Sequence, residues 1–254
     1  MKKFMIANWK MHYGPMKAGA WIRAFRRERL PKDVDIGVAI PHVSLAAAQA
    51  SLGRASVPLI GAQNAFWSNE GPFTGETSPE MLKELNSAFC LVGHSERRIH
   101  LGETDEMVAK KAAALQKAGI QPVICVGENA IQRKAGSALK VVRAQLTAAL
   151  KDVKVDGQAP PIIAYEPVWA ISTNKGAAAC STRDAQHMHE SIRELLVKKY
   201  GKGANEIRII YGGSVDLHNV ADYLSTSHID GALVGGASLD PRTFALLCRA
   251  AVPA

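Results

Sequence analysis

The chain has 254 residues, 47% of them hydrophobic and 21% charged, which suits one large core and argues against general disorder. A net charge of +8 would attract anions, but no basic run flanked by aromatic residues indicates nucleic-acid binding, and no run of roughly 18 apolar residues indicates a membrane span. The four cysteines, Cys90, Cys125, Cys180 and Cys248, form no paired motif, which argues against both a zinc site and a disulfide framework.

Short apolar runs alternate with amphipathic stretches along the whole chain. In chain order, strands are expected near residues 4–8, 35–40, 58–62, 88–93, 121–126, 161–165, 206–211 and 229–234. Helical patterns lie between them, as over Met16–Arg29, Glu103–Lys117, Ser137–Lys151 and Arg183–Tyr200. Strict alternation predicts a parallel sheet, and eight strand–helix units predict a closed α/β barrel of the (β/α)8 kind, in a single domain over residues 1–254.

Chemically distinctive residues follow five of these strands. They are, in chain order, Asn8 and Lys10, His94, Glu166, and the glycine pairs Gly212–Gly213 and Gly235–Gly236. Any one of them alone would fit a turn or a solvated loop. Because the carboxyl ends of all strands meet at one mouth of a barrel, the set as a whole predicts one site assembled from several strand ends.

Longer blocks of sequence surround these residues. They include Gly61–Asn64 (GAQN), Gly71–Glu76 (GPFTGE), Gly93–Arg98 (GHSERR), Cys125–Glu128 (CVGE) and Ala164–Ala170 (AYEPVWA). With these blocks in this order and spacing, the chain resembles the triosephosphate isomerase family over essentially its whole length. The resemblance implies a TIM barrel and an aldose–ketose isomerase, an intramolecular oxidoreductase. Such an enzyme interconverts dihydroxyacetone phosphate and D-glyceraldehyde 3-phosphate through an enediolate, in glycolysis and gluconeogenesis.

The resemblance also implies roles for five side chains. Glu166 matches the general base, and a carboxylate can move one proton between two neighbouring carbons without a metal or cofactor. His94 matches the electrophile, and the helix expected to begin directly after it would keep the imidazole neutral. Lys10 matches the active-site lysine, and Asn8 matches the residue that orients the substrate. Glu96 matches a second glutamate, which we expect to pair with Lys10.

Backbone amides are expected to bind the phosphate group of the substrate. Glycines after the seventh and eighth strands let N–H groups approach an anion. The expected binding residues are Gly213, Ser214, Gly235 and Gly236, with Ser172 from the lid that follows Glu166. No metal and no cofactor are expected, because His189-Glu190 lacks the second histidine of a zinc helix and neither a Walker loop nor a GxGxxG motif is present.

The lid is where the sequence departs from the family. Ser172 and Asn174 stand where the family has glycines, and a short insertion falls within Gly176–Cys180. We therefore expect slower or less complete closure, with more loss of the enediolate to phosphate elimination. Two alternatives stay open: an isomerase of a four-carbon sugar phosphate, and a phosphate-binding barrel that has lost its activity.

The loop from Ala65 to Glu76 has the length of the family's dimer loop. In the family, the residue that Thr74 matches reaches the region of Asn8–Lys10 in the neighbouring subunit, so a homodimer is expected. The first apolar stretch stops at Asn8, too early for a signal-peptide core, so a cytoplasmic protein is expected. Its expected small-molecule partner is a phosphorylated triose, with neither nucleic acid nor membrane as a partner.

Overall fold

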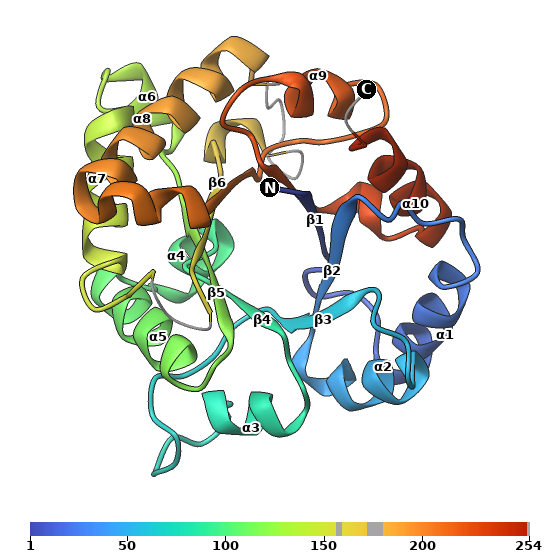
Figure 1. Cartoon of the computed structure of the whole chain (residues 1–254). Helices are drawn as coiled ribbons and strands as arrows, with labels where there is room; N and C mark the ends of the chain where they lie inside the picture. Colours follow the sequence, from blue (N-terminus) through green and yellow to red (C-terminus); the bar gives the residue numbers. More distant parts are fainter. Residues whose placement is uncertain (156–158, 172–179, 253–254) are drawn as a thin grey trace.

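The computed structural model describes residues 1–155, 159–171 and 180–252 (Figure 1). Its parallel strands pair in sequence order, and the last pairs with the first, so the sheet closes into a barrel. They are β1 (Lys3–Asn8), β2 (Val34–Ile40), β3 (Leu59–Ala62), β4 (Phe89–Val92), β5 (Gln121–Val126), β6 (Ile162–Tyr165), β7 (Arg208–Tyr211) and β8 (Gly231–Val234). The predicted (β/α)8 TIM barrel is confirmed.

Helices surround the barrel on its outside (Figure 1). They are α1 (Pro15–Phe25), α2 (Leu45–Leu52), α3 (Pro79–Glu84), α4 (Ser95–Leu101), α5 (Asp105–Lys117), α6 (Ala130–Lys134), α7 (Ala138–Ala149), α8 (Thr182–Tyr200), α9 (Val220–Ser225) and α10 (Pro241–Ala250). Short 3₁₀ turns are η1 (His42–Ser44), η2 (Val168–Ala170), η3 (Gly201–Glu206) and η4 (Gly236–Ser238). None of the helices in the described ranges is long and apolar enough to cross a membrane.

The ends of the helices follow local chemistry. Ser78 and Asp240 each accept a hydrogen bond from an amide in the first turn of the helix that they precede, which satisfies a donor without an intrahelical partner. The first predicted helix, by contrast, is shorter than its pattern. It ends at Phe25 because the amides of Arg27 and Glu28 bond to carbonyls three residues back, a 3₁₀ geometry that does not continue an α-helix.

Two apolar layers lie on either side of the strands. The barrel interior holds Phe4, Ile6, Ala39, Phe89, Leu91, Val123, Cys125, Ile162, Ala164, Ile210 and Leu233. Alternate positions on the same strands, such as Met5 and Ala7, point outward and pack beneath the helices. Burial of one large apolar side chain contributes about 1.5–3 kcal/mol, so both layers stabilise the barrel.

Phe89 fills the interior of the barrel at the level of two glycines. Its ring meets that of Phe4 edge-on, with centroids 5.9 Å apart. A Cβ at Gly61 would lie 2.4 Å from the Phe89 ring, and one at Gly37 would lie 2.7 Å from it. Glycine at these two positions therefore makes the space that the phenyl ring occupies.

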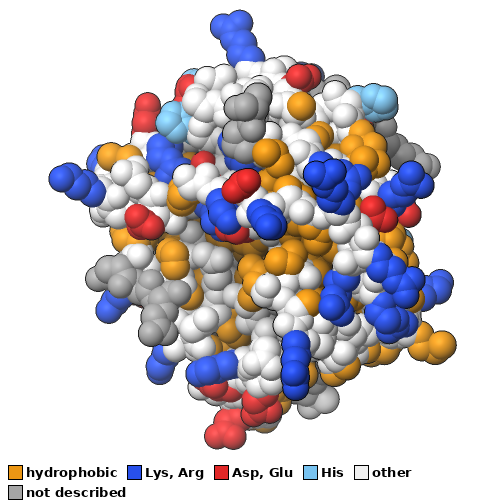
Figure 2. Space-filling model, turned by 45° about the vertical axis from the view of Figure 1, so that its right-hand side comes forward, with side chains coloured by type: hydrophobic (Ala, Val, Ile, Leu, Met, Phe, Trp, Pro, Cys, Tyr) orange, Lys and Arg blue, Asp and Glu red, His pale blue; other side chains and the backbone are white. Residues whose placement is uncertain are grey.

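An arm of residues 65–77, between β3 and α3, stands away from the barrel (Figure 1). The amide of Phe66 donates to the carbonyl of Thr77 at 2.8 Å, which closes the base of the arm. Thr74 lies in the exposed outer part of the arm. Elsewhere, Lys and Arg side chains are spread over the face in Figure 2, with fewer Asp and Glu among them, in line with the positive net charge.

Candidate active site

One cavity at the carboxyl ends of the strands brings together most of the expected site residues. It is lined by Asn8, Lys10, His94, Glu166, Gly213, Ser214, Gly235 and Gly236, which lie at or just after the ends of β1, β4, β6, β7 and β8. Glu96 lines the groove beside this cavity. Ser172 and most of the lid lie outside the described residues. Closure of the barrel thus gathers into one site residues that are spread over nearly the whole sequence.

Glu166 directly follows β6 and is only 2% exposed. Its Oε2 accepts a hydrogen bond from the amide of Ser95 at 2.9 Å, and its Oε1 lies 3.1 Å from Nε2 of His94. Burial first, and then the Glu166 carboxylate, raise the pKa of the adjacent Cys125 thiol, so this thiol keeps its proton. The carboxylate is therefore oriented in a position from which most water is excluded, where electrostatic interactions are strong.

His94 is the N-cap of α4. Its Nδ1 accepts a hydrogen bond from the amide of Glu96 at 3.3 Å. A ring nitrogen that accepts a hydrogen bond carries no proton, so this bond assigns the hydrogen to Nε2, the nitrogen that faces Glu166. The amino end of a helix also disfavours a positive charge. The imidazole is thus oriented as a neutral donor toward the cavity.

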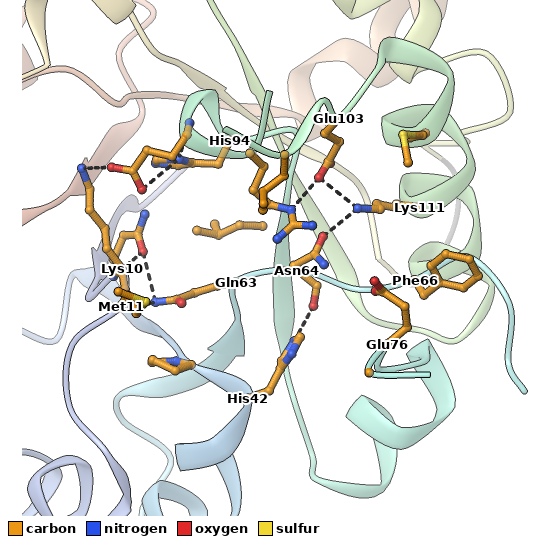
Figure 3. Close-up of a pocket in the computed structure, with 18 of the residues that line it drawn as sticks. Lys10, Met11, His42, Gln63, Asn64, Phe66, Glu76, His94, Glu103 and Lys111 are labelled. Carbon is orange, nitrogen blue, oxygen red and sulfur yellow. Dashed lines mark hydrogen bonds and ion pairs between the residues drawn. The ribbon is translucent and has the colours of Figure 1, made fainter. Parts of the chain in front are cut away.

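Lys10 enters the site from the loop after β1 with a left-handed backbone, φ 53°. Its Nζ pairs with Oε1 of Glu96 at 2.6 Å. Oδ1 of Asn8 accepts hydrogen bonds from the Lys10 amide at 3.0 Å and from the Gln63 side chain at 3.3 Å. Gln63 also donates to the carbonyls of Lys10 and Ala39, so one side chain joins the start of this loop to β2 (Figure 3). These bonds offset the cost of the unusual backbone conformation.

Backbone forms the wall of the cavity after β7 and β8. A Cβ at Gly213 would lie 2.2 Å from Oη of Tyr211, and one at Gly212 would lie 2.9 Å from Cγ of Glu166. Glycine at these two positions therefore lets the turn lie against both the end of β7 and the Glu166 side chain. A Cβ at Gly236, in contrast, would meet nothing within 4 Å. The backbone at the start of η4 is therefore exposed beside the cavity, where an anion can reach it.

A buried carboxylate holds the chain directly after Glu166. Glu128 is fully buried and accepts hydrogen bonds from the Trp169 indole at 2.7 Å and from the Tyr165 hydroxyl at 3.2 Å. The Arg133 guanidinium stacks on the Trp169 ring at 4.1 Å and lies 3.8 Å from Glu128. Because these contacts fix residues on both sides of Glu166, they set the direction in which its side chain enters the cavity.

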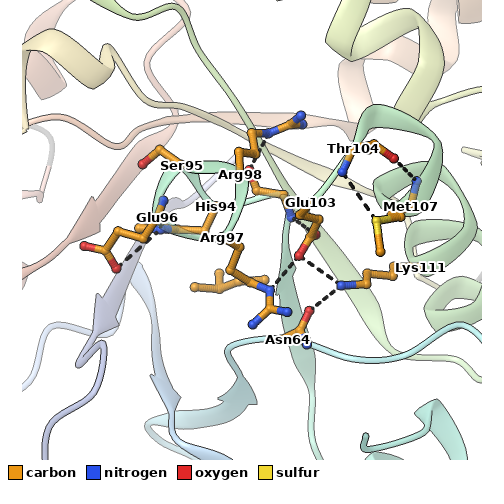
Figure 4. A network of polar contacts seen from close by, with 12 residues as sticks. Asn64, His94, Ser95, Glu96, Arg97, Arg98, Glu103, Thr104, Met107 and Lys111 are labelled. Carbon is orange, nitrogen blue, oxygen red and sulfur yellow. Dashed lines mark hydrogen bonds and ion pairs between the residues drawn. The ribbon is translucent and has the colours of Figure 1, made fainter. Parts of the chain in front are cut away.

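A groove of about 680 Å³ adjoins the cavity, and a polar network forms one wall of it (Figures 3 and 4). Glu103 accepts hydrogen bonds from Arg97 at 2.5 Å and from Lys111 at 2.9 Å, and Lys111 also donates to Oδ1 of Asn64 at 2.8 Å. Burial opposes ionisation of Glu103, but the Lys111 and Arg97 charges outweigh it and lower the pKa of the carboxyl. The network ties α4 and α5 to the end of β3.

His42, in η1, joins the two ends of the arm. Its Nε2 lies 2.6 Å from the carbonyl of Asn64, and its Nδ1 lies 3.3 Å from the hydroxyl of Thr77. Burial lowers the pKa of His42, and the charge of Arg97 lowers it further. A neutral His42 that donates to Asn64 and accepts from Thr77 satisfies both bonds, so it holds the base of the arm against the rim of the groove (Figure 3).

Several residues of this region are absent from the sequence-based prediction of the site. Gln63 lies in a block that carries the family resemblance, and that block could have pointed to it. Cys125 is a buried free thiol beside Glu166, a contact that no local sequence pattern indicates. Among the residues with described positions, no group of three His, Cys, Asp or Glu side chains could hold a metal ion.

Comparison with known proteins identifies the family. The family model described as triosephosphate isomerase matches residues 3–251. The chain is 43% identical to triosephosphate isomerases of Streptococcus thermophilus and Streptococcus gordonii, over 97% of each chain, and 42% identical to that of Streptococcus pneumoniae over the same share. Matches of this identity and coverage agree with the barrel and with the residues gathered at its mouth. The chain belongs to the triosephosphate isomerase family.

Proposed function

We propose that this protein interconverts dihydroxyacetone phosphate and D-glyceraldehyde 3-phosphate. The observation that carries the proposal is the position of the Glu166 carboxylate, which faces Nε2 of His94 in a cavity that is also lined by glycine backbone. That combination offers a base, a neutral hydrogen-bond donor and an anion site within one small space. Family membership supports the same reaction.

Proton transfer is assigned to the side chains after β1, β4 and β6. Glu166 removes a proton from one substrate carbon and returns it to the neighbouring carbon. Nε2–H of His94 donates to the substrate oxygens and stabilises the charge of the enediolate, and Lys10 adds a positive charge beside them. The imidazole gives its Nε2 proton to the carbonyl oxygen and takes the hydroxyl proton of the neighbouring oxygen, so that the carbonyl and hydroxyl groups exchange places. Asn8 orients the substrate, and Glu96 holds Lys10. This route uses only groups of the protein, so the proposal includes no metal and no cofactor.

The phosphate group is assigned to the backbone after β7 and β8. Gly213, Ser214, Gly235 and Gly236 line the same cavity as the base, and the amides of such turns suit an anion. Ser172 stays a proposed phosphate ligand, outside the described residues. The net charge of +8 favours encounter with a phosphorylated substrate through the field of the whole protein.

We also propose that residues 1–254 form one domain and that two copies associate through the arm. The groove beside the active site is lined by Lys10 and Met11, and Met11 is 96% exposed in the isolated chain. A second copy that inserts the exposed Thr74 region of its arm would cover this apolar surface. Sedimentation at micromolar concentration should give twice the mass of 27.2 kDa, and a monomer would contradict this proposal.

A cytoplasmic location and a role in glycolysis and gluconeogenesis complete the proposal. The substrates carry phosphate groups and do not cross membranes unaided, so the enzyme must share their compartment.

The activity is tested by measuring kcat/KM for D-glyceraldehyde 3-phosphate in the wild type and in E166Q. We expect a wild-type value within a few decades of the diffusional limit of about 10⁸–10⁹ M⁻¹s⁻¹. Loss of the base should lower kcat by about 10²–10⁴. A four-carbon sugar phosphate is the comparison substrate, and faster turnover of it, or no turnover of either, would overturn the proposal.

A further inference from the structure

We propose that Tyr223, on α9, is a positioning residue that sets the affinity of the site for the phosphate group. The inference rests on the proposed function, because it assigns the phosphate to the turn after β7. Tyr223 does not line the cavity. It acts through Tyr211, the last residue of β7. The turn after β7 packs against the Tyr211 side chain.

The two tyrosines form a buried stacked pair. Their ring centroids are 4.2 Å apart with an angle of 22° between the planes. Tyr211 is fully buried and Tyr223 is 3% exposed. Aromatic pairs of this kind restrict both rings, so the position of the Tyr211 hydroxyl depends on the presence and orientation of Tyr223.

The Tyr211 hydroxyl is the surface against which the phosphate turn packs. At Gly213, a Cβ would lie 2.2 Å from Oη and 2.5 Å from Cζ of Tyr211. The glycine therefore rests on the end of the phenol ring with no room between them. Because the packing is this close, any movement of the hydroxyl moves the amides of the turn.

A chain of hydroxyl groups fixes the end of the Tyr211 ring. Oη of Tyr211 donates to Oη of Tyr223 at 3.4 Å, and Oη of Tyr223 donates in turn to the backbone carbonyl of Cys180. Burial raises the pKa of both phenols, so both keep their protons at neutral pH. These two hydrogen bonds thus connect the turn after β7 to Cys180, which directly precedes Ser181, the N-cap of α8.

Removal of one oxygen from Tyr223 breaks both bonds at once. Y223F would keep the stacked ring but leave the buried carbonyl of Cys180 without its donor, and the Tyr211 hydroxyl would keep only the Cys180 side chain as a partner. Buried polar groups without partners are costly, so the Tyr211 hydroxyl would turn toward another acceptor or admit water. Either change displaces Gly213.

The test compares Y223F with Y200F. Tyr200 also donates a hydroxyl to backbone carbonyls, those of Leu150 and Val153, but it stands at the opposite end of α8. Inorganic phosphate is the probe, as a competitive inhibitor of the isomerase. We expect Y223F to raise Ki for phosphate and KM for D-glyceraldehyde 3-phosphate together by about five-fold, with kcat within two-fold of wild type. Y200F should leave all three constants unchanged.

A purely structural role would give a different result. Y223F would then lower the melting temperature as Y200F does while Ki and KM stayed at their wild-type values, and that result would overturn the inference. Calorimetric titration with inorganic phosphate needs no turnover, so it separates the two proposals. An inactive wild type would refute the isomerase, whereas equal phosphate affinity of wild type and Y223F, or no phosphate binding by either, would refute the role of Tyr223.

Discussion

The two sides of the cavity are built in opposite ways. On the proposed proton-transfer side, Glu166 and His94 are nearly fully buried, and hydrogen bonds from the amides of Ser95 and Glu96 hold the carboxylate and the imidazole in place. On the proposed phosphate side, Gly213 and Gly236 offer backbone; Gly236 is exposed, whereas Gly213 is buried against Tyr211. A base needs a fixed side chain, whereas an anion needs backbone amides. Substitutions on the first side should therefore change kcat, and those on the second should change KM.

After the loss of the base in E166Q, His94→Gln should have the largest effect. Glutamine can still donate a hydrogen bond, but it lacks a ring held between the Glu96 amide and Glu166. The loss of one well-placed donor costs about 10²–10³ in kcat. Steady-state kinetics should show this loss with Ki for phosphate unchanged. A variant that instead weakened phosphate binding would break the division between the two sides.

His189 lies behind both sides of the cavity, because its ring packs against Tyr165 of β6 and Tyr211 of β7. Burial lowers the pKa of His189 to about 4, whereas an unfolded histidine titrates near 6.5. Between these values the unfolded state binds a proton that the folded state does not. Stability is therefore fully present above pH 6.5 and decreases as the pH falls to 4, by about 3 kcal/mol.

Urea unfolding at several pH values would measure this decrease. H189Q should flatten the dependence between pH 4 and 6.5, although the variant is less stable throughout. H187Q, which changes an exposed histidine on the same helix, is the matched control and should keep the wild-type dependence. Equal slopes in all three proteins would show that His189 is not the titrating group.

Two glycine substitutions sharpen the comparison on the phosphate side. A methyl group at Gly213 would overlap the Tyr211 hydroxyl, whereas one at Gly236 would meet no neighbour. We expect G213A to raise KM about ten-fold, and G236A to change it less than three-fold, with kcat nearly constant in both. If G213A and G236A raised KM by similar factors, the contact between Gly213 and Tyr211 would not determine how the turn binds the substrate.

Glu96→Gln should have the smallest effect. The Lys10–Glu96 pair is short, but the glutamate side chain is 38% exposed, so solvent weakens its influence. We expect kcat/KM to fall only a few-fold and the fall to diminish at high salt. Kinetics at two ionic strengths would check this, and a loss as large as that of His94→Gln would assign Glu96 to the proton-transfer step itself.

Local sequence patterns predict most of the fold and most of the residues gathered in the cavity. Strands such as Gln121–Val126 can be predicted from the sequence because burial on both faces requires a continuous apolar run. Contacts between residues that are distant in the sequence cannot be predicted in this way. Gln63 reaches Asn8, and Tyr223 reaches Cys180, across long stretches of sequence. Neither partner alters the local pattern around the other, so only the closed barrel reveals these pairs.

The contact between Gly61 and Phe89 means that substitutions at these two positions are tolerated only together. A larger residue at 61 would collide with the ring, and a smaller one at 89 would leave a void in the middle of the barrel. Each single change passes through an unstable protein, whereas a paired change could keep the volume constant. Relatives that evolve from this sequence should therefore change both residues together or keep both. In a library randomised at positions 61 and 89, the folded members should be mainly those in which the combined volume of the two residues is close to that of glycine plus phenylalanine.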